Sequence, residues 1–203
     1  MEIKIVKVIC IALLSVCCNA QTDKKKVGDK IYGDFNGDGK FEYAFSVLTK
    51  KGKGNPVEDG VPDGYQIQFS DKKIKSIKVD CCSFRLINEG DLNKNGSDEI
   101  SIVQAPMNGC SGLVSTFTIK NDKSYYLFEP FSIFICAELS DEEIQKLVFI
   151  EKDYVYYLEA DPNDENLLNE SGEKIRFERL RKIKTNVKAI SKNAQDALDS
   201  IKH

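Results

Sequence analysis

Apolar and polar residues alternate along much of the middle of the chain, as they do in strands that bury one face. The segment 65–69 reads Tyr-Gln-Ile-Gln-Phe and is the clearest example. Further apolar runs follow at 74–79, 84–87, 100–103, 113–119, 125–128 and 131–136. Polar turn residues at 70–73 and 120–123 separate neighbouring runs and predict hairpins. The pattern therefore predicts a mainly β protein built from antiparallel sheets.

The second half of the chain adds a hairpin and two helices to this prediction. Residues 148–150 and 154–158 form two short runs around a polar turn at 151–153. Ser140 and Glu143 form a capping box, which predicts a short helix to about residue 147. An apolar stripe at helical spacing predicts a final helix at about 185–202. Its members are Val187, Ile190, Ala194, Leu198 and Ile201.

Length and composition indicate one globular domain. The chain has 203 residues, 41% of them hydrophobic, and a net charge of −3. This charge gives no reason to expect nucleic acid as a partner. Residues 30–203 are predicted to form a single β-rich domain after a polar linker at 21–29. The segment 49–63 is rich in Gly, Lys, Pro and Asp and predicts a long exposed loop that borders a site.

Residues 1–20 have the charged start and short apolar run of a targeting segment. Two processing sites compete. Cleavage after Ala20 would leave Gln21 at the start of a secreted or periplasmic protein. A loose lipobox at 14–18 would instead make Cys17 or Cys18 the lipidated first residue of an outer-membrane lipoprotein. In either case the segment predicts export, with membrane attachment only through an N-terminal lipid anchor.

Four cysteines follow the leader, at positions 81, 82, 110 and 136. An exported chain with an even set of cysteines favours disulfides over reactive thiols. A bond between neighbouring Cys81 and Cys82 is sterically awkward, so the expected bond joins one of them to Cys110. The alternative is that the cysteines are small buried apolar residues.

One decapeptide pattern, G-D-x-N-x-[DN]-G-x-x-E, occurs at 33–42 and again at 90–99. Oxygen atoms at such spacing can form the cage that calcium requires. In the first loop the expected ligands are Asp34, Asn36, Asp38, the carbonyl of Lys40, and Glu42. In the second loop they are Asp91, Asn93, Asn95, the carbonyl of Ser97, and Glu99. For each loop the competing interpretation is a hydrogen-bonded Asp/Asn-Gly turn without an ion. Asn95 replaces an acid and Lys94 adds positive charge, so the second site is expected to be the weaker.

An EF-hand carries a glutamate at position 12 of its loop and continues into a helix. Counted from Asp34 and Asp91, position 12 is the apolar Phe45 or Ile102, and a strand-like segment follows, so these loops are not EF-hands. They resemble the calcium loops of the FG-GAP and VCBS repeat families, in which such a loop joins two strands of a β-propeller blade. The resemblance implies calcium at the loops and blade-like antiparallel sheets. A propeller needs at least about four blades, and the chain has room for fewer, so we expect blade-like sheets that do not complete a propeller.

The remaining chemistry excludes several enzyme classes. His203 is the one histidine, which argues against a histidine-based triad, a Cys-His dyad and a histidine zinc site. The leading hypothesis is an exported, calcium-stabilised, non-enzymatic binding or structural protein of the bacterial cell envelope, with a protein or glycan ligand. The alternatives are an exported hydrolase with an acidic pair near a calcium loop, and a small partner or inhibitor protein that uses the 49–63 loop.

Overall fold

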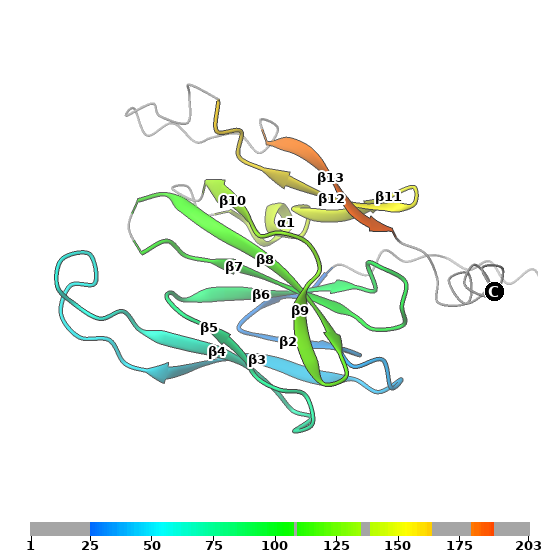
Figure 1. Cartoon of the computed structure of the whole chain (residues 1–203), viewed down its shortest axis with the longest axis horizontal. Helices are drawn as coiled ribbons and strands as arrows, with labels where there is room; N and C mark the ends of the chain where they lie inside the picture. The colour runs from blue at the N-terminus through cyan, green and yellow to red at the C-terminus, as the bar shows by residue number, and fades with distance from the viewer. Residues whose placement is uncertain (1–24, 108, 135–138, 164–179, 189–203) are drawn as a thin grey trace, which may run out of the picture.

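The structure is a computed structural model that describes residues 25–107, 109–134, 139–163 and 180–188. The protein is mainly β, with three antiparallel sheets and one short helix among these residues. In Figure 1 the sheets follow one another from the bottom of the view to the top. The prediction of a mainly β protein built from antiparallel sheets is confirmed, and the sheets do not close into a barrel.

The first sheet is a meander in which four strands pair in chain order. The strands are β2 (Lys30–Gly33), β3 (Glu42–Lys50), β4 (Gly64–Phe69) and β5 (Ile77–Val79). The first acidic loop joins β2 to β3, and Gly33 pairs with Glu42 at its base. The loop therefore connects adjacent antiparallel strands, as the repeat predicts.

The central sheet has the order β1-β6-β7-β8-β10, and β9 pairs with the second half of β8. The strands are β1 (Val27–Gly28), β6 (Phe84–Gly90), β7 (Glu99–Gln104), β8 (Ser111–Lys120), β9 (Lys123–Tyr126) and β10 (Phe131–Phe134). The second acidic loop joins β6 to β7, and Gly90 pairs with Glu99. A two-residue turn at Asn121 and Asp122, both with positive φ, closes the predicted β8–β9 hairpin.

The third sheet has the order β11-β12-β13. Its strands are β11 (Val148–Glu151), β12 (Tyr154–Glu159) and β13 (Arg181–Lys188), and α1 (Asp141–Ile144) precedes them. The predicted capping box is confirmed, because Ser140 and Glu143 bond each other's backbone N–H. The predicted β11–β12 hairpin is also confirmed.

Two hydrophobic cores lie on opposite faces of the central sheet. The first core, between the first and central sheets, includes Ile31, Ala44, Ile67, Leu86, Ile100 and Ile102. The second core, between the central sheet, α1 and the third sheet, includes Ile87, Val103, Val114, Ile144, Val148 and Val155. Residues 99–103 of β7 are consequently all buried.

Two sequence predictions differ from the structure. The final helix was expected from about residue 185, but residues 185–188 belong to β13, where the Thr185 hydroxyl donates to the carbonyl of Val155. The rest of that prediction, and the leader at 1–20, lie outside the described residues. The expected linker at 21–29 contains β1, which pairs with β6. No helix within the described ranges is long and apolar enough to span a membrane.

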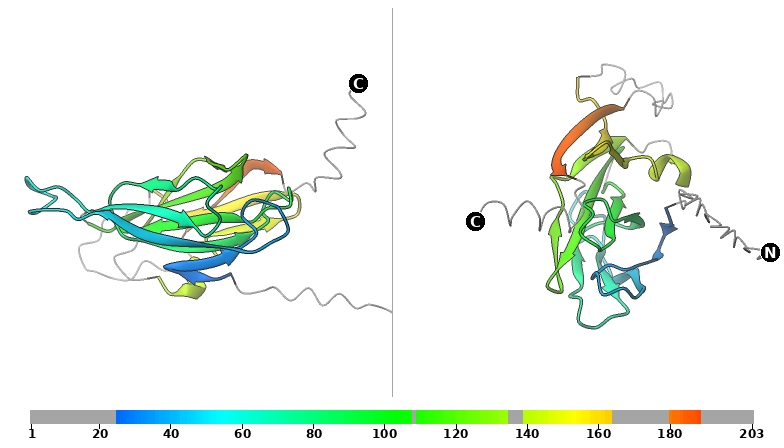
Figure 2. Two further views of the ribbon diagram at one scale, coloured as in Figure 1. Left: turned by 90° about the horizontal axis from the view of Figure 1, so that it is seen from below. Right: turned by 90° about the vertical axis from the view of Figure 1, so that its right-hand side faces the viewer.

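The predicted loop between β3 and β4 is an ordered projection, which we call the finger (residues 51–63). The backbones of Lys53 and Val61 pair through two hydrogen bonds, of 2.9 and 2.8 Å. The carbonyl of Asn55 accepts the N–H groups of Glu58 and Gly60 nearer its tip. The finger extends away from the sheets in Figure 2 (left), so it presents surface on both sides.

Burial of the central sheet predicts where truncation is costly. Ile102 is 2% exposed in the first core, and Ile102→Ala should lower the free energy of unfolding by about 2–5 kcal/mol. Leu113→Ala, at a residue that is 39% exposed, is the control and should cost less than about 1 kcal/mol. Urea unfolding measures both. Equal losses for the two variants would contradict the two-faced burial of this sheet.

Candidate functional site

The first acidic loop closes on itself through its own side-chain oxygens. Asp34 Oδ1 accepts the backbone N–H of Asp38 at 3.0 Å, and Asp34 Oδ2 accepts that of Gly39 at 2.9 Å. Asn36 Oδ1 accepts the same Asp38 N–H at 3.0 Å, and Asp38 Oδ1 accepts the N–H of Lys40 at 2.9 Å. These bonds hold the chain in a tight turn, and each oxygen keeps a lone pair for a further partner.

Glu42 brings a third carboxylate to this turn from the start of β3. Its Oε2 accepts the N–H of Phe35 at 2.9 Å. One oxygen each of Asp34, Asp38 and Glu42 lies within 4.8 Å of the others, the one such group of three among the described residues. Burial raises the pKa of Glu42, and the bond from Phe35 opposes this shift. The carboxylates of Asp34, Asp38 and Asp71 raise that pKa further, a repulsion that a bound cation would relieve.

The second acidic loop repeats this network position by position. Asp91 Oδ1 and Oδ2 accept the N–H groups of Asn95 and Gly96 at 2.9 and 2.8 Å. Asn93 Oδ1 accepts the Asn95 N–H at 3.0 Å, and Asn95 Oδ1 accepts both the N–H and the hydroxyl of Ser97 at 2.8 and 2.7 Å. The fifth and seventh residues of the decapeptide have positive φ in both loops: Gly37, Gly39, Lys94 and Gly96.

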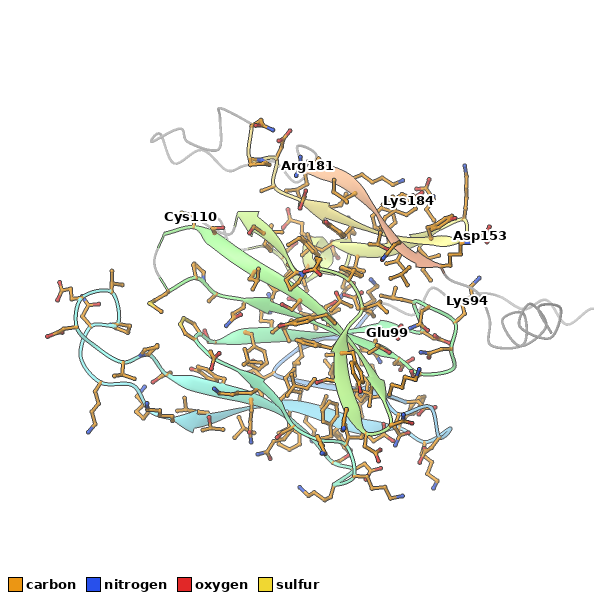
Figure 3. The ribbon with its side chains drawn as sticks, viewed as in Figure 1. Lys94, Glu99, Cys110, Asp153, Arg181 and Lys184 are labelled. Carbon is orange, nitrogen blue, oxygen red and sulfur yellow. A yellow bond between two sulfur atoms is a disulfide. The ribbon has the colours of Figure 1, made fainter. Side chains whose placement is uncertain are left out.

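Glu99 takes the last position of the second loop and is fully buried. Its Oε2 accepts the N–H groups of Leu92 and Asn93 at 2.7 and 3.3 Å, and its Oε1 accepts Asn93 Nδ2 at 2.8 Å. Burial raises the pKa of Glu99 to about 8. The side chain of Thr118 opposes the shift, although its buried Oγ1 makes no hydrogen bond of good geometry to a described residue. Figure 3 shows Glu99 inside the fold and Lys94 at the tip of this loop.

Asp98 joins the two loops. Its backbone N–H donates to the carbonyl of Asp34 at 2.8 Å, and its Oδ2 accepts the Asp34 N–H at 3.1 Å. The same Oδ2 accepts Asn88 Nδ2 at 3.1 Å, and this amide also donates to the carbonyl of Tyr32. Because these residues belong to the first and central sheets, their hydrogen bonds fix the two acidic loops side by side.

Gly33 is required by this close approach. A Cβ there would lie 2.6 Å from Asn88 Nδ2 and from Asp98 Oδ2. It would also lie 2.7 Å from the ring of Phe35. A side chain at Gly33 would therefore displace the side chains of Asn88 and Asp98, whose hydrogen bonds join the two loops.

A cavity of about 580 Å³ lies beside both loops, and we call it the inter-loop cavity. Phe41 of the first loop and Tyr32 of β2 line it and are 81% and 42% exposed. Asp98, Lys25 and Glu89 add charged groups. Glu89 forms an ion pair with Lys25, and its side chain is 1% exposed. The cavity thus combines exposed rings with hydrogen-bonding groups that are already held in place.

The structure brings together the residues that the repeat singled out, with one difference between the loops. In the first loop Asp34, Asp38 and Glu42 converge, whereas the second loop has only Asp91 and the buried Glu99 as acids within its network. The backbone N–H groups of Lys40 and Ser97 donate to the side-chain oxygens of Asp38 and Asn95, two residues earlier in the same loop.

Sequence reasoning missed three residues near the loops: Asn88, Asp98 and Asp71. The two copies of the repeat differ at the ninth residue, which is Phe41 in the first loop and Asp98 in the second. Asp71 lies in a predicted turn and accepts Asn36 Nδ2 at 3.2 Å. Its position in the β4–β5 connection gave no signal that it would reach the first loop.

The expected disulfide between Cys110 and one of the paired cysteines is wrong. Cys81 bonds to Cys82 instead, and Cys110 is itself disulfide-bonded, to neither of them. The physical reason is the strand order, because β7 lies between β6 and β8. The cysteines before β6 and before β8 are therefore about two strand spacings, roughly 10 Å, apart, too far for a disulfide.

Comparison of the chain with protein-family models, curated proteins and solved structures found no match. The resemblance of the two loops to FG-GAP and VCBS repeats therefore stays a prediction. It rests on the residues of the loops and on the strands that they join.

Glu99 predicts a pH dependence of stability in the calcium-free protein. Its ordinary pKa is 4.5 and its pKa in the fold is about 8, so between these values the folded state keeps a proton that the unfolded state has released. The free energy of unfolding should fall as pH rises through this window, by up to about 1.4 kcal/mol per pH unit. Glu99→Gln should reduce that slope.

Urea unfolding in chelator at several pH values between 5 and 8 measures this slope. Glu129→Gln, at an exposed residue, is the matched control and should leave it unchanged. An identical slope in wild type and Glu99→Gln would show that Glu99 is not protonated in the fold.

Proposed function

We propose that the protein is an exported, calcium-stabilised binding protein of the bacterial cell envelope, and that it has no enzymatic activity. The observation that carries the proposal is the convergence of Asp34, Asp38 and Glu42 within 4.8 Å, beside a cavity. Export rests on the leader at 1–20. A calcium ion would stabilise the first loop and, through Asp98, the neighbouring second loop.

Calcium is the cation that suits this donor set. It takes six to eight oxygen ligands in flexible geometry, and the first loop offers three carboxylates, the amide oxygen of Asn36 and the carbonyl of Lys40. Burial raises the pKa of Glu42, and the carboxylates of Asp34, Asp38 and Asp71 raise it further, so a cation bound here would favour the charged form of Glu42. Within the FG-GAP and VCBS resemblance, the β2–β5 meander would correspond to one blade-like sheet. The helical spacing of the apolar stripe beyond Val187 separately supports a final helix.

The second loop is the weaker candidate for an ion. Its Asn93 amide donates to Glu99, and its Asn95 Oδ1 already accepts two bonds from Ser97. Glu99 is largely uncharged at neutral pH, because burial raises its pKa to about 8. A cation would have to displace the proton from Glu99, which makes binding there weaker than at the first loop.

The inter-loop cavity is the proposed ligand site, and a glycan is the ligand class that its surface suits best. The exposed rings of Phe41 and Tyr32 can contact the apolar faces of sugar rings. Asn88, Asp98 and Lys26 line the same cavity and can pair with hydroxyl groups. Sites of this kind combine apolar walls with a few fixed polar groups.

One observation favours the hydrolase alternative, since Glu89 and Asp98 place two carboxylates on this cavity. Both are engaged in the fold, however. Glu89 pairs with Lys25, and Asp98 accepts bonds from Asp34 and Asn88. A general acid and base must be available to the substrate, so the arrangement favours binding.

The partner or inhibitor alternative is supported by the finger. Val57 and Val61 are 51% and 43% exposed on it, and the finger projects from the sheets (Figure 2). Two exposed valines make a small patch, well below the area that stable protein interfaces bury. The inter-loop cavity therefore remains the preferred binding site.

Calcium should raise the melting temperature relative to chelator. At about one hundred times the dissociation constant an ion adds about 2.7 kcal/mol, a rise on the order of 5–10 °C in a domain of this size. Asp38→Asn should remove most of the rise, because it keeps an oxygen for the Lys40 N–H but loses the charge. Differential scanning calorimetry measures both proteins with calcium and with chelator.

Asp153→Asn, in the exposed β11–β12 turn, is the matched control and should respond to calcium as wild type does. Titration calorimetry with Asn95→Asp tests the order of the loops, since the added acid should strengthen the second site. The same melting temperature for wild type in calcium and in chelator would rule out the ion.

Phe41→Ala should weaken glycan binding at least about tenfold if its ring stacks on a sugar, and should leave the melting temperature unchanged because Phe41 is 81% exposed. Tyr125→Ala, at a ring that is 51% exposed on β9, is the control. A panel of soluble bacterial and plant polysaccharides, screened by affinity electrophoresis, provides the measurement. Release of new reducing ends in the same mixtures would favour the hydrolase, and no retardation by any polysaccharide would remove the glycan proposal.

A further inference from the structure

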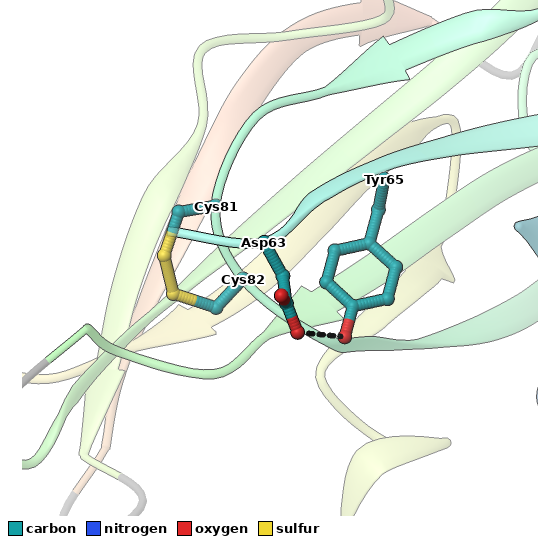
Figure 4. Close-up of a disulfide and its surroundings, with 4 residues drawn as sticks. All are labelled: Asp63, Tyr65, Cys81 and Cys82. Carbon is teal, nitrogen blue, oxygen red and sulfur yellow. Dashed lines mark hydrogen bonds between the residues drawn. A yellow bond between two sulfur atoms is a disulfide. The ribbon is translucent and has the colours of Figure 1, made fainter. Parts of the chain in front are cut away.

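The disulfide between Cys81 and Cys82 lies in the wall of a second cavity, of about 370 Å³, at the base of the finger. Figure 4 shows it beside Asp63 and Tyr65, whose hydroxyl donates to Asp63 Oδ2 at 3.4 Å. Lys51 and Lys53 of the finger line the same cavity. Both cysteines line the cavity and are half-buried, so a small molecule bound there lies next to them.

This disulfide does little to hold the fold together. The stabilisation from a disulfide grows with the length of the chain that it closes, and this one joins adjacent residues. The segments on either side have their own anchors. Val79 at the end of β5 pairs with Tyr65, and Phe84 at the start of β6 pairs with Gln104. Opening the bond would therefore leave both sheets paired.

The charges around the pair favour thiol–disulfide exchange. Lys53 is a cation on the cavity, and a nearby cation stabilises the thiolate that leaves when a disulfide is attacked. The facing acid, Asp63, is occupied: it accepts the Gly52 N–H at 2.6 Å and Lys51 Nζ at 3.3 Å. Asp80, next to the pair, forms an exposed ion pair with Lys78 at 2.9 Å.

We propose that Cys81–Cys82 is a redox-active disulfide that a dithiol donor reduces reversibly. A thiolate of the donor attacks one sulfur, which forms a mixed disulfide and releases the other cysteine as a thiolate. The second donor thiol then attacks the mixed disulfide and leaves as part of an oxidised donor. Two electrons pass to the pair, and the two cysteine sulfurs take up the two protons that the donor gives up.

The adjacency of the cysteines makes the site selective for dithiols. The thiolate released in the first step stays beside the mixed disulfide, where its effective concentration is high. It therefore expels a monothiol before a second monothiol molecule can react. A dithiol completes the second step within the same complex, so it alone gives a stable reduced pair. Reduction then opens the small ring that the disulfide closes between Cys81 and Cys82 at the base of the finger.

The test uses the full chain with its native disulfides, and dithiothreitol and 2-mercaptoethanol at equal thiol concentration. Free thiols are alkylated without denaturant, and tryptic peptides are weighed. Cys81 and Cys82 lie together in peptide 79–85, and Cys110 lies in peptide 95–120. After treatment with dithiothreitol, peptide 79–85 should carry two alkyl groups while Cys110 stays oxidised. After treatment with 2-mercaptoethanol, alkylation of this peptide should be at least about tenfold lower.

Three variants sharpen the result. The double variant Cys81→Ser, Cys82→Ser should keep a melting temperature within about 2–4 °C of wild type. Lys53→Ala should slow labelling of the reduced pair about threefold and Lys53→Arg should restore it, whereas Lys72→Ala on the distant β4–β5 turn should have no effect. The proposal fails if the pair stays oxidised until Cys110 is reduced, or if peptide 79–85 carries free thiols in protein never exposed to reductant. It also fails if the double variant unfolds, because the disulfide would then be structural.

Discussion

Burial of both faces of the central sheet is the constraint on which the other elements depend. Residues 99–103 of β7 are all buried, so the neighbouring layers must supply apolar side chains on both faces of the sheet. The first sheet supplies one layer, with Ile31 and Ile67 at 0% exposure, and the third sheet with α1 supplies the other, with Val148 and Val155 at 0%. The buried hydroxyls of Ser101 and Thr116 pair with each other at 2.8 Å within this sheet, which offsets the cost of burying them.

The two acidic loops belong to this arrangement because each sends an apolar residue into a different core. Phe35 belongs to the first core and Leu92 to the second. In both loops the backbone N–H of that residue donates to the last glutamate, Glu42 or Glu99. A contact with the core and a polar turn are thus coupled through one residue. Movement in either loop would be transmitted to the packing of a core, and an ion bound in the loop would restrain both.

Equal sequence patterns can acquire different chemistry from their surroundings. Glu42 and Glu99 hold the same loop position, but Glu99 lies deeper and burial raises its pKa to about 8. The first loop therefore gathers three carboxylates, whereas in the second loop Glu99 is largely protonated and uncharged at neutral pH. Asp98 holds the two loops in a fixed arrangement, because it belongs to the second loop and bonds to the backbone of Asp34 in the first.

The sequence by itself determined the strands, the hairpin turns, the capping box at Ser140 and the ligand-like order of the acidic loops. These features depend on neighbours within about ten residues, so local pattern carries them. Tertiary structure alone decided that Asp98 would meet Asp34, that β7 would separate Cys110 from the paired cysteines, and that residues 185–188 would extend the third sheet. Those outcomes depend on which strands become neighbours, and pairing between distant segments leaves no periodic signal in either one. The apolar stripe through Val187 fits a helical spacing. As a strand, however, residues 185–188 pair with the open edge of β12, whose backbone N–H and C=O groups a helix there would have left unpaired.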